Sequence, residues 1–252
     1  MDAVGARRIV GAGTPEAAWQ DWLRAHPLPA QSARELAGGS RTVHVLAPHP
    51  DDEILGCAGI MRQLAGLGLD VQVWAVTDGE ASHPDSPRYP GDALAEIRTR
   101  ESRRALRALG IPARRARLRL PDGGVSANEA ALTERLADRL EAGDLVLGTW
   151  SLDGHPDHEA VGRAGRRAAL RARCRYFDVP IWGWHWAAPE RGELPADRAC
   201  RIPLAPDDLQ AKRLAVQRFR SQLEPDPDTG RPPILPAFAL ERLLRPFEVL
   251  LR

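Results

Sequence analysis

Residues 44–56 read HVLAPHPDDEILG, and the fold prediction starts from this stretch. A short apolar run ends at a proline, and a histidine and three acidic residues follow it directly. The apolar run is typical of a buried strand, whereas residues 52–67 carry apolar side chains at helical spacing. Polar residues between a strand and the helix that follows it are typical of a ligand site at the edge of a parallel sheet.

The same strand and helix alternation continues along most of the chain. We expect strands at 42–47, 71–77, 115–121, 144–150 and 174–182, and helices at 14–25, 52–67, 93–110, 128–143 and 158–172. This order predicts an α/β fold whose mostly parallel sheet is covered by helices on both faces. Without a repeat or a clear linker, we expect one domain over residues 1–252. Residues 1–40 form an N-terminal extension with one helix, and residues 190–252 add further strand and helix elements.

Composition narrows the classes of function. The 252 residues carry a formal net charge of +1, which gives no reason to expect a nucleic acid or an anionic membrane as partner. The three cysteines form no CxxC pair, so neither a thiolate zinc site nor a disulfide framework is predicted. The N-terminus lacks the apolar segment of a signal peptide, and no apolar run approaches the ~20 residues of a membrane span. We therefore expect a cytoplasmic protein that acts on a small molecule; a homo-oligomer stays open.

Two polar clusters follow the first and the fourth expected strands. The first consists of His49, Asp51, Asp52 and Glu53, and the second of Asp153, His155, Asp157 and His158. Well-capped helices would explain one acidic residue in each cluster, because carboxylates suit a helix N-terminus. They do not explain the histidines. Two imidazoles and one carboxylate that leave a position open for water are the ligands of a catalytic divalent metal.

The residues alone leave the roles within these clusters open. Asp51 and Asp52 are adjacent, so one can bind the metal while the other takes a proton from the metal-bound water. The histidine that does not bind the metal can stabilise an oxyanion, with Asp153 or Asp157 to hold it. The same ligand set also describes non-haem Fe(II) oxygenases. The expected parallel sheet disfavours that alternative.

Several motifs together resemble the LmbE/PIG-L family of zinc-dependent N-acetylglucosaminyl deacetylases. They are APHPDDEILGCAG at 47–59, TDGE at 77–80, an Arg-x-x-Glu pair at Arg98 and Glu101, GHPDHEAVG at 154–162 and, less specifically, FRSQ at 219–222. The resemblance implies a Rossmann-like fold. It also implies that His49, Asp52 and His158 bind zinc, with ferrous iron able to take the same ligands, and that Asp51 is the general base.

The resemblance further implies an oxyanion-stabilising role for His155, with Asp157 as its orienting partner, and a contact of Arg98 with substrate hydroxyls. The reaction implied is hydrolysis of the acetamide of an N-acetylglucosamine conjugate by metal-bound water. Cleavage of a larger acyl group from a glycosamine conjugate is an alternative. A sugar-binding protein without catalysis is another, and it would have no need of Asp51.

Two further stretches raise hypotheses about the substrate pocket. IWGWHWAAP at 181–189 contains several aromatic residues, and we assign Trp184, His185 and Trp186 to substrate binding, because indole faces stack on pyranose rings. A layer packed onto the core is the alternative for these tryptophans. A third His-Pro-Asp copy at 83–85 lies in the Pro-rich loop 79–92 and lacks a second aspartate. We interpret it as coincidental, the alternative being a lid whose His83 touches the substrate.

Overall fold

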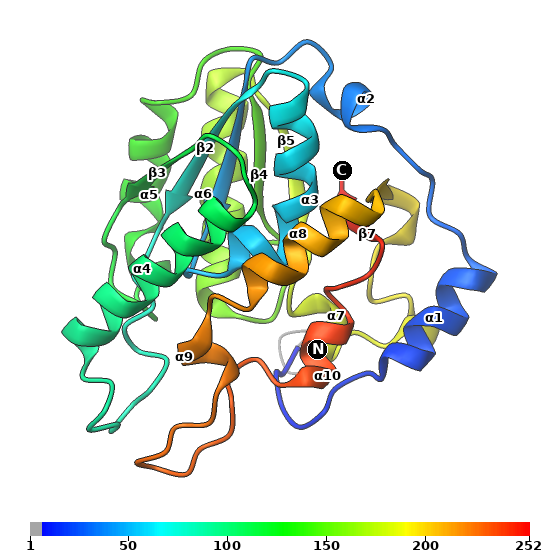
Figure 1. Cartoon of the computed structure of the whole chain (residues 1–252). Helices are drawn as coiled ribbons and strands as arrows, with labels where there is room; N and C mark the ends of the chain where they lie inside the picture. The colour runs from blue at the N-terminus through cyan, green and yellow to red at the C-terminus, as the bar shows by residue number, and fades with distance from the viewer. Residues whose placement is uncertain (1–6) are drawn as a thin grey trace, which may run out of the picture.

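The computed structural model describes residues 7–252, and a seven-stranded sheet forms its centre (Figure 1). The strand order is β3-β2-β1-β4-β5-β7-β6. The strands are β1 (Thr42–Ala47), β2 (Asp70–Ala75), β3 (Ala113–Arg117), β4 (Leu145–Thr149), β5 (Arg175–Val179), β6 (Ala199–Pro203) and β7 (Phe247–Leu251). The first five pair in parallel, while β7 runs antiparallel to both of its neighbours. The predicted mostly parallel α/β sheet is thus confirmed.

Helices cover both faces of the sheet, because alternate strand residues point to opposite sides. In β1, Val43 and Val45 belong to one hydrophobic cluster and Leu46 to the other. Residues of α3 (Asp52–Gly66), α4 (Gly91–Ala108) and α8 (Pro206–Val216) complete the first cluster, and residues of α5 (Glu129–Ala137) and α6 (Pro156–Ala172) complete the second. Figure 1 shows α3, α4 and α8 together in front of the sheet.

The order of the strands places the two polar clusters side by side. β1 and β4 are neighbours, but the chain leaves β1 toward β2 and leaves β4 toward β5. In a parallel sheet, this reversal opens a crevice at the carboxyl ends of the two strands, where ligands bind. Loop 48–51 follows β1 and loop 150–155 follows β4. Segments about a hundred residues apart in the chain therefore meet at one edge of the sheet.

The C-terminal half departs most from the sequence prediction. The expected strand 174–182 ends at Val179, because Pro180 has no N–H to continue the ladder, and the short helix α7 (Gly183–Trp186) follows. After α8, the separate short helix α9 (Arg220–Leu223) follows, since the chain turns at the fully buried Phe219. After α10 (Ala237–Glu241), the closing amphipathic stretch ends in β7, which inserts between β5 and β6.

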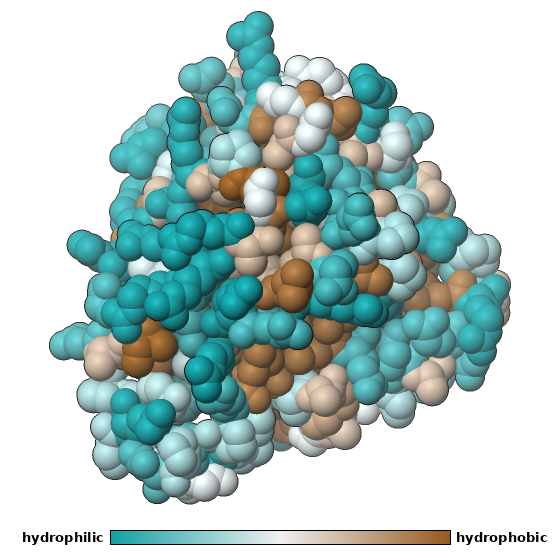
Figure 2. Space-filling view, in the orientation of Figure 1, coloured by the Kyte–Doolittle hydropathy of each residue, from teal (hydrophilic) through white to brown (hydrophobic). Residues whose placement is uncertain are grey.

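The N-terminal part packs along the C-terminal elements. It contains α1 (Glu16–Ala25), as predicted, and the short α2 (Ala33–Ala37), which was not predicted. Figure 2 shows hydrophobic side chains gathered on the surface below α8 and close to α10. Near α10, Ile234 and Phe238 are each 37% exposed. None of the helices within residues 7–252 combines the length and the apolar character needed to cross a bilayer.

Candidate functional site

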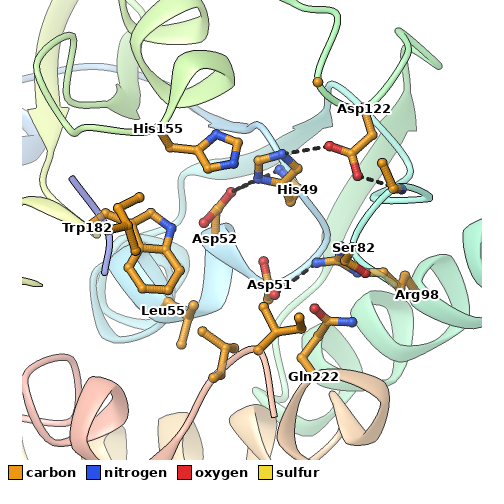
Figure 3. A pocket seen from close by; sticks show the side chains of 15 residues that line it. His49, Asp51, Asp52, Leu55, Ser82, Arg98, Asp122, His155, Trp182 and Gln222 are labelled. Atoms are coloured by element: carbon orange, nitrogen blue, oxygen red, sulfur yellow. Dashed lines mark hydrogen bonds and ion pairs between the residues drawn. The ribbon is translucent and has the colours of Figure 1, made fainter. Parts of the chain in front are cut away.

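A cavity of about 460 Å³ opens at the carboxyl edge of the sheet (Figure 3). This volume suits a small-molecule ligand. Charged and polar side chains line one part of the cavity, and Leu55 and Trp182 line another. The polar lining consists of His49, Asp51, Asp52, Ser82, Arg98, Asp122, His155 and Gln222. Residues from segments far apart in the chain meet here, so the cavity exists only in the folded protein.

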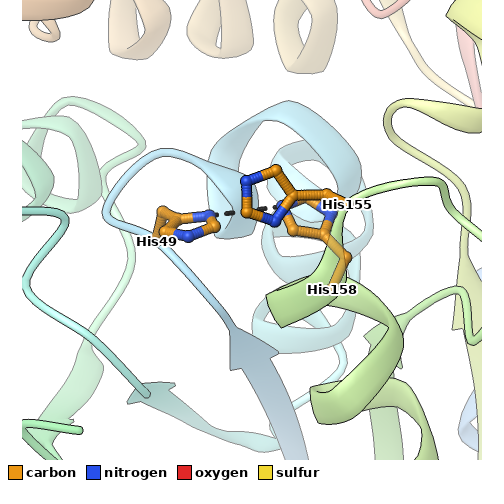
Figure 4. A group of neighbouring side chains, drawn as sticks. All are labelled: His49, His155 and His158. Carbon is orange, nitrogen blue, oxygen red and sulfur yellow. Dashed lines mark hydrogen bonds between the residues drawn. The ribbon is translucent and has the colours of Figure 1, made fainter. Parts of the chain in front are cut away.

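Three donor atoms face one point beside this cavity. His49 Nδ1, Asp52 Oδ2 and His158 Nε2 form a triangle in which each side measures 3.3 Å. Ligand atoms about 2.0–2.2 Å from a tetrahedral zinc ion lie about 3.3–3.6 Å from one another. His155 stands next to this triangle, and the ligand atoms of the three histidines lie within 4.8 Å of one another (Figure 4). The donor set therefore fits a divalent metal in composition and in spacing.

A carboxylate holds the other nitrogen of each of the two imidazoles in the triangle. His158 Nδ1 lies 2.8 Å from Asp153 Oδ2, and His49 Nε2 lies 3.1 Å from Asp122 Oδ1. In metal sites such carboxylates fix the tautomer, so that the nitrogen facing the metal keeps its lone pair. In this arrangement His49 Nδ1 and His158 Nε2 are the nitrogen atoms whose lone pairs are available to a metal ion. It is a second and independent reason that these residues fit a metal.

Asp153 is itself held rigidly. Its carboxylate is fully buried and accepts the backbone N–H groups of Ile181, Trp182 and Gly183 at 2.8–3.0 Å. These donors lie at the beginning of α7, where N–H groups have no partner within the helix. The backbone of the turn after β5 thus holds the Asp153 carboxylate in position, and this carboxylate in turn holds the His158 ring.

The carboxylates make the centre favourable for a cation. Burial alone would lower the pKa of His158, but Asp52 and Asp153 outweigh it and raise the pKa to about 9. Burial would likewise lower the pKa of His49, but hydrogen bonds to Asp122, Asp157 and Asp52 hold it well above its usual value. Without a metal, protons on the imidazoles provide the positive charge that these acidic groups attract.

Asp51 lies next to the triangle but makes different contacts. Arg98 Nη2 donates to Asp51 Oδ2 at 3.0 Å, whereas the other carboxylate oxygen faces the cavity (Figure 3). Burial raises the pKa of Asp51 to about 7, although the Arg98 charge opposes this shift. Arg98 is buried and also donates to the carbonyl oxygens of Gly79 and Pro50. Gly79 has a φ of 72° and a Cβ there would collide with the Arg98 guanidinium, so this position requires glycine.

The hydrogen bonds of His155 indicate an uncharged imidazole ring. Its Nδ1 accepts the backbone N–H of Asp157 at 3.3 Å, so the ring proton belongs on Nε2. Burial, and then the neighbouring His158 and His49, lower the pKa of His155 to about 3. The Asp157 carboxylate accepts N–H groups of Gly123 and Val125 instead. Asp157 thus contacts His155 through its backbone N–H, while its carboxylate also lies 3.4 Å from His49 Nε2.

Comparison with known proteins identifies the family. A sequence profile described as PIG-L, GlcNAc-PI de-N-acetylase, matches residues 44–169, which is half of the chain. The chain belongs to the PIG-L family. The resemblance found in the motifs is thereby confirmed, and the matched region runs from β1 through most of α6. It thus includes both polar clusters and Arg98.

Two relatives match the chain over about half of its length. The diacetylchitobiose deacetylase of Thermococcus kodakarensis is 31% identical over 142 residues, which cover 55% of this chain and 52% of the relative. The 1D-myo-inositol 2-acetamido-2-deoxy-alpha-D-glucopyranoside deacetylase of Kineococcus radiotolerans is 37% identical over 164 residues, 52% of this chain and 45% of the relative. The chain thus spans about half the length of these relatives.

The likeness in fold to a solved structure extends beyond the matched sequence. The N,N'-diacetylchitobiose deacetylase from Pyrococcus horikoshii, solved with an inhibitor, superposes with a TM-score of 0.59 at 21% identity. The superposition covers 83% of this chain and 80% of that one. Since identity is low, this likeness supports the fold alone.

The tryptophans predicted to bind substrate lie elsewhere. Trp184 is buried beneath the Arg245 guanidinium, 4.2 Å from its ring, and Trp186 stacks on Trp150. Neither lines the cavity, whereas Trp182 of the same stretch does. Because this segment is helical, Trp184 points away from the face that carries Trp182, whereas Trp186, four positions after Trp182, packs on Trp150. The alternative of a packed aromatic layer describes Trp184 and Trp186.

His185 holds the N-terminal segment in place. Its Nδ1 accepts from Arg242 at 2.8 Å, and its Nε2 lies 3.1 Å from the Val10 carbonyl oxygen. Because arginine can only donate, the ring proton is on Nε2. Val10 is adjacent to Ile9, and Ile9 lines the cavity, so this contact holds a segment of the cavity wall. His185 itself is not among the residues that line the cavity.

The loop with the third His-Pro-Asp copy contributes through other residues. Ala81 and Ser82 line the cavity, but His83 is buried beside Tyr89, with ring centroids 4.7 Å apart. The geometry thus separates His83 from the His-Pro-Asp copies at 49–51 and 155–157, which lie together at the triangle of donor atoms.

Asp122, Trp182 and Gln222 are among the cavity residues that the sequence interpretation missed. Asp122 contacts His49 and also accepts the Ala81 N–H at 2.8 Å. A signal was present: PDGG at 121–124 directly follows the strand expected at 115–121, and the carboxyl-edge rule applies there as well. For Trp182, the sequence offers no feature that separates it from its neighbours.

Proposed function

We propose that this protein removes the acetyl group from an N-acetylglucosamine-type sugar conjugate by metal-dependent hydrolysis. The observation that carries the proposal is the triangle of donor atoms on His49, Asp52 and His158, next to the cavity-facing carboxylate of Asp51. Family membership supports it. Both relatives are named as deacetylases, one of diacetylchitobiose and one of an acetamido-glucopyranoside.

His49, Asp52 and His158 would hold the metal, and zinc suits two imidazoles and one carboxylate. A bound zinc ion supplies Lewis acidity and lowers the pKa of a water ligand to about 7. Ferrous iron is accepted by the same ligands. The chain's contribution is to hold these donors in place through Asp122 and Asp153, which reduces the reorganisation needed on binding.

Asp51 is proposed as the general base. Arg98 restrains one of its oxygens, which directs the other toward the cavity, where it takes a proton from the attacking water. A base is most effective when its pKa lies near the working pH. Burial of Asp51 shifts its pKa in that direction.

His155 is proposed to stabilise the oxyanion of the tetrahedral intermediate. Its Nδ1 is occupied by the Asp157 N–H, so a neutral ring presents its Nε2–H as a donor. The ring lines the cavity opposite Asp51 (Figure 3). A donor fixed in advance toward developing negative charge is the usual form of this stabilisation.

Acetate release tests the proposal. Metal-loaded protein is incubated with N-acetylglucosamine glycosides, and acetate and free amine are measured with and without a chelator. We expect His49→Ala and His158→Ala to lose both bound metal and activity, whereas His26→Ala, at an exposed histidine, keeps both. Asp51→Ala should keep the metal and lose turnover by about 10²–10⁴-fold.

Each alternative gives a different result in this assay. Full activity in a rigorously chelated sample contradicts the metal role. Turnover that requires O₂ and a reductant indicates an oxygenase. Faster cleavage of longer N-acyl groups than of acetyl indicates an amidase, and sugar binding without any release of amine indicates a binding protein.

A further inference from the structure

Gln222 in α9 carries a polar atom that the fold leaves without a partner. The side chain is fully buried and lines the cavity, yet its Oε1 accepts no hydrogen bond from any residue within 7–252. A buried acceptor left unpaired costs about 1–3 kcal/mol, so it calls for an explanation. We propose that Gln222 is a substrate-binding residue whose Oε1 accepts a hydrogen bond from a hydroxyl of the sugar. This inference rests on the proposed function and adds to it a specificity-determining contact.

The orientation of the amide follows from its neighbours. The Glu101 carboxylate accepts the Ser221 hydroxyl at 2.6 Å and the Ser221 backbone N–H at 2.9 Å. Because the hydroxyl proton is committed to Glu101, the Ser221 oxygen can only accept from Gln222, and it lies 2.9 Å from Gln222 Nε2. The amide nitrogen thus faces Ser221. The amide oxygen is left to face the cavity, and the opposite amide orientation would place two acceptors against each other.

The backbone of Gln222 is also fixed. Its N–H donates to the Phe219 carbonyl oxygen at 2.9 Å, and its own carbonyl oxygen accepts the Leu235 N–H at 2.9 Å. Leu235 lines the same cavity, and Phe219 is fully buried. A side chain held in this way loses little conformational freedom when a ligand binds, which favours affinity and selectivity.

A second residue that lines the cavity carries an unpaired hydrogen-bond donor, whereas Gln222 carries an unpaired acceptor. Arg98 uses both terminal nitrogens in hydrogen bonds, but its Nε has no partner within residues 7–252. Two residues that line the cavity therefore each carry one buried unpaired atom, an acceptor on Gln222 and a donor on Arg98. A hydroxyl group both donates and accepts, so a polyhydroxylated ring can satisfy both atoms, whereas an apolar group would leave both unpaired. Figure 3 shows Gln222 and Arg98 on neighbouring parts of the wall.

Deoxy substrates test the contact. We would compare wild type with Gln222→Leu on methyl 2-acetamido-2-deoxy-glucopyranoside and on its 3-, 4- and 6-deoxy analogues. Gln222→Leu should lower kcat/KM on the parent sugar by about tenfold, which is the usual effect of one lost hydrogen bond to a buried group. For one deoxy analogue, the kcat/KM of wild type should fall by the same factor. The kcat/KM of the variant should not fall further with that analogue. Gln217→Leu, at an exposed glutamine after α8, is the matched control.

Measurements on related variants separate binding from structural damage. The amount of bound metal should be the same in Gln222→Leu as in wild type. If Gln222→Leu folds poorly, Gln222→Met, which retains an unbranched side chain, should show the same dependence of kcat/KM on the deoxy substrates. Ser221→Ala removes the group that orients the amide, so it should weaken the dependence on the same hydroxyl. Ser221→Thr keeps the hydroxyl and should restore that dependence.

Two failures can be told apart. If wild type is active but the losses from Gln222→Leu and from every deoxy substitution simply multiply, Gln222 has no hydroxyl partner and this inference is wrong while the proposed function stands. If metal-loaded wild type releases no acetate from any of these sugars, the proposed function is wrong and this inference with it.

Discussion

Each imidazole of the proposed metal centre is held by a carboxylate from a different part of the chain. Asp122, in the loop after β3, contacts His49, and Asp153, in the loop after β4, contacts His158. An imidazole whose proton is committed to a carboxylate presents its lone pair to the metal without rearrangement. The metal affinity therefore depends on residues that do not touch the metal.

We predict that Asp153→Asn lowers zinc affinity by about 10–100-fold, which is the usual effect of losing such a support. An asparagine keeps one acceptor oxygen, whereas Asp153 uses both of its oxygens, toward His158 and three backbone N–H groups. Competition with a chromophoric chelator measures the change. Asp138→Asn, at an exposed position, is the control, and equal affinity in both variants would show that Asp153 does not support the site.

At the scale of elements, the position of α6 decides where two of the three histidines lie. Gly162 packs directly onto the end of β4, and a Cβ there would collide with the Thr149 carbonyl oxygen and come within 2.9 Å of the Ser151 nitrogen. Thr149 also donates its hydroxyl to the His158 carbonyl oxygen at 2.9 Å. This close packing of helix on strand places His155 and His158 beside the loop that carries His49.

Gly162→Ala should therefore move the beginning of α6 and destabilise the fold by about 1–3 kcal/mol, as other overpacked substitutions do. Gly66→Ala is the matched control, because no atom lies within 4 Å of its Cβ position at the end of α3. That change should be neutral or gain up to about 1 kcal/mol from helix propensity. Urea unfolding of the two variants measures the difference, and equal stability would contradict the packing argument.

The element scale also shows where sequence reasoning is reliable. The strand expected at 42–47 has those bounds in the structure, because its apolar run and the prolines after it are local features. The β7 pairing was not foreseen. Whether 247–251 forms a strand depends on the free edges of β5 and β6, which are remote in sequence.

In the whole molecule, one buried ion pair connects elements on one face of the sheet. Lys212 of α8, the only lysine of the chain, lies 2.8 Å from Glu248 of β7, and both are almost fully buried. The Glu248 carboxylate also accepts the Gly59 and Ile60 N–H groups of α3 at 3.1 and 2.8 Å. The C-terminal strand is thereby joined to the helix that begins at the proposed metal site.

We predict that Lys212→Met destabilises the protein by about 3–5 kcal/mol, since it leaves the Glu248 charge buried without a counter-charge. Adding Glu248→Gln to this variant should recover part of the loss, because the uncompensated charge is then removed. Arg213→Met, at the exposed neighbouring position, should change stability little. Denaturant midpoints measure all three, and a small effect of Lys212→Met would show that water reaches Glu248.

The sequence by itself determined the α/β alternation, the two polar clusters and the residue types of a metal site, because these depend on local periodicity and on motif spacing. It could not rank the residues of 181–189 or find the partners of the site. Trp182, Asp122 and Gln222 reach the cavity from loops and a short helix whose positions depend on packing between distant segments. Only the tertiary structure decided which side chains face the cavity, since burial and hydrogen-bond partners are properties of the folded chain and not of its local sequence.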